Sequence, residues 1–116
     1  MASTVRTAQL SLALEVLSEK WRITILHQLL GGPLRTSQLQ RTLGNISAKV
    51  LTQTLRGLER DGLLERHVTP GVPPRVEYTL TPIAENLITA LDDLSCWSEA
   101  YGRETLLARR RYDARA

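Results

Sequence analysis

The stretch "ISAKVLTQTLRGLERDGLLERHVTPGVPPRVEYTLT", residues 46–81, contains the features that decide the fold. Its first half has leucines at helical spacing, Leu51, Leu55 and Leu58. They follow Ser47, a residue type that caps helices by accepting a hydrogen bond from a first-turn amide. Its second half contains two strand-like runs separated by prolines and a glycine. The stretch therefore predicts a helix followed by an antiparallel β-hairpin.

The predicted hairpin has a stiff tip. Its strands, expected at 63–69 and 76–81, are joined by "PGVPP", residues 70–74. Proline has no backbone donor and glycine tolerates positive φ, so this segment cannot extend a sheet and is expected to turn the chain. A stiff tip would hold Arg75 at its base with less ordering entropy to lose on binding. The alternative is a rigid surface loop that makes no contacts.

The helix predicted before the hairpin has two faces. At about 100° per residue, the side chains of Lys49, Gln53, Arg56 and Arg60 gather almost opposite the leucines. In a helix that enters the major groove, glutamine can pair with adenine, and arginine or lysine with guanine. The alternative is an ordinary solvated face, which is what most charged helix faces are.

A second short helix is expected just upstream. Ser37 and Gln40 fit the capping-box pattern, in which each side chain satisfies an unpaired backbone amide, and Gly44 ends the helix. Two short helices about a glycine-containing turn form a helix-turn-helix. The start of this helix, at Thr36 and Ser37, is expected to contact phosphate through backbone amides and the positive helix end.

Helices are also predicted at both ends of the chain. Apolar residues recur at helical spacing over 10–17 and 20–30, and Thr81 with Pro82 starts a last helix to about residue 108. Its apolar stripe is wider than one neighbour requires, which predicts a partner helix from a second copy. The residues expected at this dimer interface are Leu10, Leu14, Leu17, Leu87, Leu91, Leu94, Trp97 and Tyr101. The basic run over 109–116 is expected to be a fraying, solvated tail.

This order of elements predicts a mostly α fold with a small two- or three-stranded antiparallel β wing, the winged helix-turn-helix. We expect a single domain over 1–116, made of the first two helices (8–35), the helix-turn-helix (36–62), the wing (63–81), the dimerisation helix (82–108) and the tail (109–116). The residues expected to contact DNA are Thr36, Ser37, Ser47, Lys49, Thr52, Gln53, Arg56, Arg60 and Arg75.

Composition narrows the function classes. The net charge of +3 and pI near 9.5 are a modest basic bias that suits a nucleic-acid partner. The single cysteine, Cys96, forms no intramolecular disulfide, and no secretory or membrane segment is evident, so we expect a cytoplasmic protein. Phosphate-binding glycine loops, serine-nucleophile motifs and paired-cysteine metal spacings are missing from the sequence. We therefore expect neither an enzyme nor a bound cofactor or metal.

Three segments, Lys20-Trp21, "ISAKVLTQTLRGLERDGL" and "PPRVEYTLT", carry a resemblance to the HxlR-type winged helix-turn-helix regulators of bacteria, which covers about Ala8 to Tyr101. The resemblance implies a dimeric, DNA-binding transcriptional regulator whose first and last helices form the dimer interface. Many members carry a cysteine just before the first helix, which some use as a thiol sensor, but here Ala8 occupies that position, so the redox switch is not carried over. Cys96, beside Leu94 and Trp97 on the last helix, is expected to be a packed interface residue of low reactivity.

The main reading is thus a homodimeric regulator, expected to be a repressor, that binds double-stranded DNA at a pseudo-palindromic operator. A variant adds a small-molecule effector between the dimer helices, near Trp21, Trp97 and Tyr101. The rival from another class is a winged-helix protein-interaction module that binds no DNA. Removing the charges of Arg56 and Arg75 separates the two, because only the first predicts loss of DNA binding.

Overall fold

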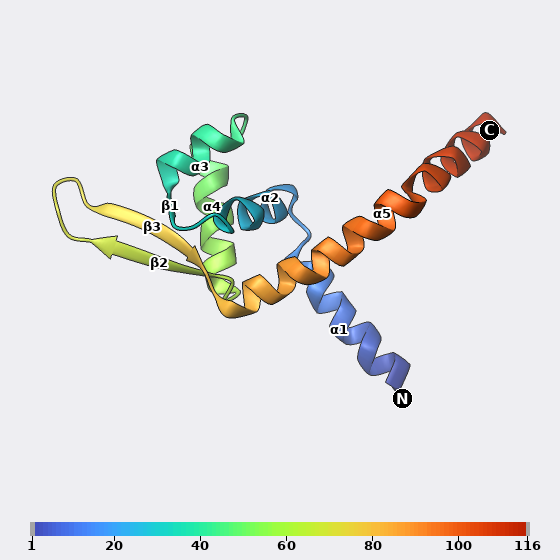
Figure 1. Cartoon of the computed structure of the whole chain (residues 1–116), viewed down its shortest axis with the longest axis horizontal. Coiled ribbons are helices and arrows are strands. Elements are labelled where there is room, and N and C mark those ends of the chain that lie inside the picture. Colours follow the sequence, from blue (N-terminus) through green and yellow to red (C-terminus); the bar gives the residue numbers. More distant parts are fainter. Residues whose placement is uncertain (1, 116) are drawn as a thin grey trace. The chain divides into compact units, whose positions relative to one another are not determined.

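The computed structural model describes residues 2–115, which form five helices and three strands in the described chain (Figure 1). The helices are α1 (Ala2–Val16), α2 (Lys20–Leu29), α3 (Thr36–Leu43), α4 (Ala48–Arg60) and α5 (Pro82–Ala114). The strands are β1 (Leu34–Arg35), β2 (Leu64–Thr69) and β3 (Arg75–Leu80). The chain divides into two compact units between Glu85 and Asn86, so that α5 begins in the first unit and makes up the second.

The wing is a three-stranded antiparallel sheet in the order β1-β3-β2, so β3 is the central strand (Figure 1). Tyr78 of β3 lies opposite Leu34 of β1 and Arg66 of β2. The predicted hairpin is confirmed, with β2 and β3 paired in register from Leu64 with Leu80 to Thr69 with Arg75. The third strand is the short segment before α3, which pairs with β3 over two residues.

The core of the first unit is built from leucines and isoleucines of α2, α3 and α4. Leu51, Leu55 and Leu58 of α4 are almost completely buried, which confirms the apolar face predicted for this helix. Thr54 is also buried, and its hydroxyl donates to the carbonyl of Val50 at 2.8 Å. Because polar groups buried in this way need a hydrogen-bond partner, a threonine is tolerated on the core side of α4.

Two of the predicted helix caps are confirmed. Ser47 Oγ accepts a hydrogen bond of 3.1 Å from the amide of Val50 and so caps α4. Thr81 precedes Pro82 at the start of α5; its Oγ1 accepts a hydrogen bond of 3.4 Å from the amide of Ala84 and donates one of 2.7 Å to the carbonyl of Gly62. This second bond ties the start of α5 to the turn after α4, where Gly62 has a φ of 77° that favours glycine.

The cap predicted for α3 is wrong by two residues. The helix starts at Thr36, and the amide of Arg35 donates to Gln38 Oε1 at 2.8 Å, so Gln38 supplies the capping acceptor. Ser37 lies inside the first turn. The cause is the pairing of β1 with β3, which keeps the chain extended up to Arg35 and moves the helix start ahead of the serine.

Both terminal helices are longer than predicted. Helix α1 begins at Ala2 instead of near residue 10, and α5 continues to Ala114, past the predicted end at residue 108. Residues 109–114 of the expected fraying tail are therefore helical, whereas Ala116 lies outside the described residues. The segment after Gly102 is rich in arginine, alanine and leucine, which have high helix propensity, and it contains no proline.

Candidate nucleic-acid interface

Helix α4 presents an exposed polar face. Lys49, Gln53, Arg56 and Arg60 are all exposed, and Thr52 is half-buried at the edge of this face. Among the residues that the structure describes, none of the four has a hydrogen bond or ion pair from its side chain. Their polar groups are therefore free to contact a partner that lies along the helix.

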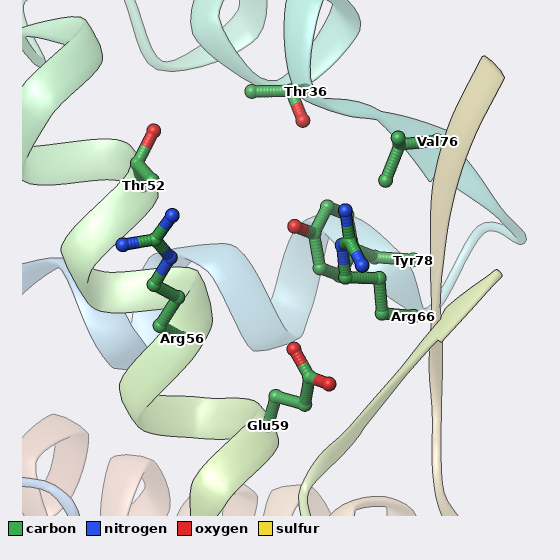
Figure 2. A pocket seen from close by; sticks show the side chains of 7 residues that line it. All are labelled: Thr36, Thr52, Arg56, Glu59, Arg66, Val76 and Tyr78. Atoms are coloured by element: carbon green, nitrogen blue, oxygen red, sulfur yellow. The ribbon is translucent and has the colours of Figure 1, made fainter. Parts of the chain in front are cut away.

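A pocket of about 340 Å³ lies between α4 and the wing (Figure 2). Helix α4 contributes Thr52, Arg56 and Glu59, and Thr36 at the start of α3 closes one side (Figure 2). The remaining lining residues, from β2 and β3, are Arg66, Val76 and Tyr78. Figure 2 shows the tyrosine hydroxyl and the guanidinium of Arg56 directed from opposite sides into this space.

A second hollow, of about 290 Å³, lies at the junction of α3 with the base of the wing. It is lined by Thr36, Ser37 and Arg75, three of the predicted DNA-contacting residues, together with Arg35, Pro74 and Val76. Thr36 and Val76 line both hollows, so the two are neighbours on one side of the first unit. Two arginines beside the start of a helix, where backbone amides are unpaired, form a surface that suits a phosphate group.

The structure thus brings together most of the residues expected to contact DNA. Thr36, Ser37 and Arg75 surround one hollow, while Thr52 and Arg56 line the other. Ser47 is exposed at the start of α4, and its capping bond uses the hydroxyl as an acceptor, which leaves the hydroxyl hydrogen available to donate. Lys49, Gln53 and Arg60 lie along the exposed face and line neither hollow.

The sequence reasoning missed Arg35 and Arg66. Arg66 lies between Leu64 and Val68 on the strand face that is otherwise apolar, and it pairs across the sheet with the buried Tyr78. An arginine that interrupts an apolar alternation is a detectable signal, because such a position normally faces a core. Arg35 gave no comparable signal, since its place beside Arg75 follows from the pairing of β1 with β3.

The residues expected at the dimer interface differ in exposure. In α1, Leu10 and Leu14 are exposed and Leu17, just after the helix, is half-buried. In α5, Leu94, Trp97 and Tyr101 are each more than half exposed, Leu87 is half-buried and Leu91 is buried. Leu91 therefore offers little free surface to a second copy, whereas Leu94, Trp97 and Tyr101 leave an apolar stripe on α5 uncovered within the described chain.

The aromatic and cysteine side chains of the second unit lie on its surface. The rings of Trp97 and Tyr101 are adjacent, with centroids 6.2 Å apart. Cys96, which was expected to pack at the interface between two copies, is exposed within the single described chain. Over residues 2–115 no group of histidine, cysteine, aspartate and glutamate side chains is arranged to hold a metal ion.

None of the described helices combines the length and apolar character that crossing a membrane requires.

Comparison with known proteins identifies the family. The family model described as HxlR-like helix-turn-helix matches residues 16–106. YkvN, an HTH-type transcriptional regulator of Bacillus subtilis, is 43% identical over 90 residues, which cover 78% of this chain and 76% of YkvN.

Solved structures agree with the family match. A transcriptional regulator of Enterococcus faecalis, described as a MarR-family protein, is 38% identical and superposes with a TM-score of 0.79 over 86% of this chain and 91% of its own. The redox regulator HypR in its reduced form is 31% identical, with a TM-score of 0.76 over 86% of this chain and 98% of its own. These relatives are regulators and not enzymes, and they confirm the predicted winged fold. The chain belongs to the HxlR-like helix-turn-helix family of transcriptional regulators.

Proposed function

We propose that the chain acts as a homodimer that binds a pseudo-palindromic operator sequence-specifically and represses transcription by occluding a promoter. In this proposal α4 of each protomer lies in the major groove, and the wing meets the neighbouring backbone. Such a regulator acts on the chromosome, so the proposed location is the bacterial cytoplasm. Occlusion is favoured over activation because the described elements are taken up by the helix-turn-helix, the wing and the two terminal helices, without a separate surface for recruiting polymerase.

One observation carries the proposal. The exposed face of α4 holds side chains that can hydrogen-bond to base edges, and in the described chain these side chains have no hydrogen-bond or ion-pair partner. Lys49 and Gln53 lie in the first two turns of α4, the part of a recognition helix that reaches base edges. Arg60 lies near the helix end, where contact with phosphate is expected. A purely solvated face is equally exposed, but it does not explain the arginine-lined hollow beside this helix or the second one, which adjoins the first at the base of the wing.

The exposed apolar residues of α1 and of α5 each support the proposed homodimer. Both helices leave large apolar side chains exposed, Leu10 and Leu14 in α1 and Leu94, Trp97 and Tyr101 in α5. Exposed apolar stripes of this kind mark interaction surfaces. A second copy also explains operator symmetry, because a two-fold dimer recognises two half-sites one helical turn apart.

We further propose that a small apolar effector binds beside Trp97 and Tyr101 and changes operator affinity. The adjacent, exposed rings support this, since aromatic side chains are common in ligand sites. An effector should change tryptophan fluorescence and operator affinity together, because an effector that alters operator affinity has its own affinity altered by the operator to the same degree. A compound that shifts fluorescence without changing affinity contradicts this part of the proposal.

Base reading by α4 is tested with operator duplexes that the wild-type protein enriches from a random pool. Gln53→Ala should lower affinity for the enriched duplex by about tenfold or more and relax the preference at one base position, with little effect on a scrambled duplex. Gln28→Ala, an equally exposed change on α2, is the matched control and should leave both affinities unchanged. Equal behaviour of the two variants contradicts base reading by Gln53.

A further inference from the structure

We propose that the pocket between α4 and the wing seats one backbone phosphate of the operator, held jointly by Arg56 and Arg66. This inference rests on the proposed operator binding and assigns a ligand to a specific pocket within it. It also moves Arg56 from the residues that read bases to those that position the backbone. The ligand chemistry is that of an oxyanion, and the proposed source is DNA.

Arg66 lies on the face of the wing that is turned toward the pocket. Residues of β2 and β3 on the pocket side of the wing are otherwise apolar or aromatic, with Leu64, Val76 and Tyr78 around this arginine. The opposite face of the wing carries the polar residues Glu65, His67, Glu77 and Thr79. An arginine confined to the apolar face has its charge directed at the pocket and away from the solvated face (Figure 2).

The pocket is lined by two arginines that come from different elements. Arg56 approaches from α4 and Arg66 from β2, so their guanidinium groups lie on different walls of one pocket (Figure 2). Neither group has a hydrogen-bond or ion-pair partner among residues 2–115. Two planar donor groups that face one space match the several acceptor oxygens of a phosphate, and charge-assisted bonds of this kind are the strong ones.

The neutral lining fits the same ligand. The hydroxyl of Tyr78 points into the pocket although the residue is only 6% exposed, and Thr36 and Thr52 add hydroxyl groups at its edges (Figure 2). Hydroxyl groups donate hydrogen bonds to phosphate oxygens and carry no sequence information. Arg56 also lies beyond the first two turns of α4, past the part of the helix that reaches base edges.

Glu59 places a negative charge beside the two arginines of the pocket. Its carboxylate faces the pocket, so the local balance is two positive charges against one negative (Figure 2). A carboxylate near a bound phosphate lowers affinity, because like charges repel. Removing this charge should therefore strengthen binding, an effect opposite in sign to the loss of either arginine.

The test measures binding of the full chain to a duplex of about 30 base pairs, long enough for two half-sites one turn apart, enriched by the wild-type protein. A scrambled duplex of equal length is measured in parallel, and both titrations run from about 0.05 to 0.3 M salt. The variants are Arg66→Gln, Arg66→Lys, Arg56→Gln and Glu59→Gln. Arg103→Gln removes the same charge from an exposed site on α5 and serves as the control. Circular dichroism and thermal unfolding establish that each variant is folded.

The proposal predicts a common signature for Arg66→Gln and Arg56→Gln. For each protomer on the DNA, the slope of log affinity against log salt should fall in magnitude by about 0.9 and affinity near 0.15 M salt by about fivefold. The loss should be similar for the enriched and scrambled duplexes. Arg66→Lys should keep the salt slope while binding more weakly, because lysine retains the charge without the planar fork. Glu59→Gln should raise affinity, and Arg103→Gln should change nothing.

The opposite outcomes are distinct. If the wild type binds the enriched duplex and Arg66→Gln behaves like Arg103→Gln, the phosphate seat is wrong while operator binding stands. If Arg56→Gln weakens only the enriched duplex, Arg56 reads a base and the shared seat is also wrong. If inorganic phosphate or acetate perturbs the Tyr78 resonances while Arg66→Gln leaves DNA binding intact, the pocket holds a free anion instead. If the wild type enriches no duplex, both proposals fail.

Discussion

Arg22 of α2 donates a hydrogen bond of 2.6 Å from Nη1 to Oδ2 of Asp61, the residue that directly follows α4. The same Nη1 donates to the carbonyl of Val16, the last residue of α1, at 3.0 Å. The arginine side chain is only 12% exposed. One guanidinium therefore connects the end of α1 to the end of the helix that carries the polar face.

The rest of this guanidinium is tightly surrounded. Its Nε is buried without a hydrogen-bond partner in the described chain, and the carboxylate of Glu19 lies 3.8 Å away, within ion-pair but not hydrogen-bond distance. A Cβ placed on Gly57 would come within 2.5 Å of Nη2. The side chain of Arg22 passes over Gly57 and leaves no room for a Cβ, which accounts for a glycine in the middle of α4.

Removing the negative charge of this acceptor should destabilise the first unit. Asp61→Asn replaces the carboxylate that is hydrogen-bonded to the buried guanidinium with a neutral amide, and we expect a loss of about 1 to 3 kcal/mol in the free energy of unfolding. Urea denaturation at one fixed protein concentration measures the loss. Asp93→Asn, at an exposed site in α5, is the control and should have little effect. Equal effects of the two changes contradict the linking role of Arg22.

The glycine in α4 should show a background-dependent effect. Alanine has a higher helix propensity than glycine by about 1 kcal/mol, yet Gly57→Ala displaces the guanidinium of Arg22. We expect no gain in the wild type, and a gain of about 0.5 to 1 kcal/mol when Arg22→Met is already present. The four unfolding free energies form a double-mutant cycle. A gain of the same size in both backgrounds rules out the steric coupling.

The cap of α4 offers a prediction with an internal control. Ser47→Ala removes the acceptor for the amide of Val50 and should cost about 1 kcal/mol in stability. Ser47→Asn supplies another good capping acceptor and should stay close to the wild type. Thermal unfolding of the two variants compares them. Similar losses for both substitutions argue against a capping role.

The apolar stripe of α5 predicts how the protein associates. Leu94→Asp together with Trp97→Asp places charges on exposed apolar positions, and the proposed homodimer should dissociate into monomers. Sedimentation velocity measures the change. Arg103→Asp lies on the opposite face of the helix at about 100° per residue and should leave the association state unchanged. A wild-type protein that sediments as a monomer contradicts the dimer directly.

Local sequence patterns predicted much of the fold. The leucines of α4, the Ser47 cap, the Thr81-Pro82 start of α5 and the pairing of β2 with β3 each depend on neighbouring residues, and all are confirmed. The start of α3 was misplaced because it depends on β1 pairing with a strand far along the chain. The lengths of the terminal helices were underestimated because polar helix formers there show no apolar periodicity.

The candidate interface was predictable only in part. The exposed face of α4 follows from helical periodicity, since Lys49, Gln53 and Arg56 are placed by their spacing from the leucines. The pockets beside it combine residues from three or four elements, and no local pattern places Arg66 next to Arg56 or Arg35 next to Arg75. The bond from Arg22 to Asp61 joins residues 39 positions apart and is equally invisible in the sequence.

The most direct test of operator binding is a salt titration of the wild-type protein against its own promoter-proximal DNA and an unrelated fragment of equal length. Because phosphate charge supplies much of the affinity, binding to the promoter fragment should be tight, should fall steeply with salt and should exceed binding to the unrelated fragment throughout. Equal, weak binding to both fragments across the series would contradict sequence-specific recognition of that promoter by the exposed face of α4.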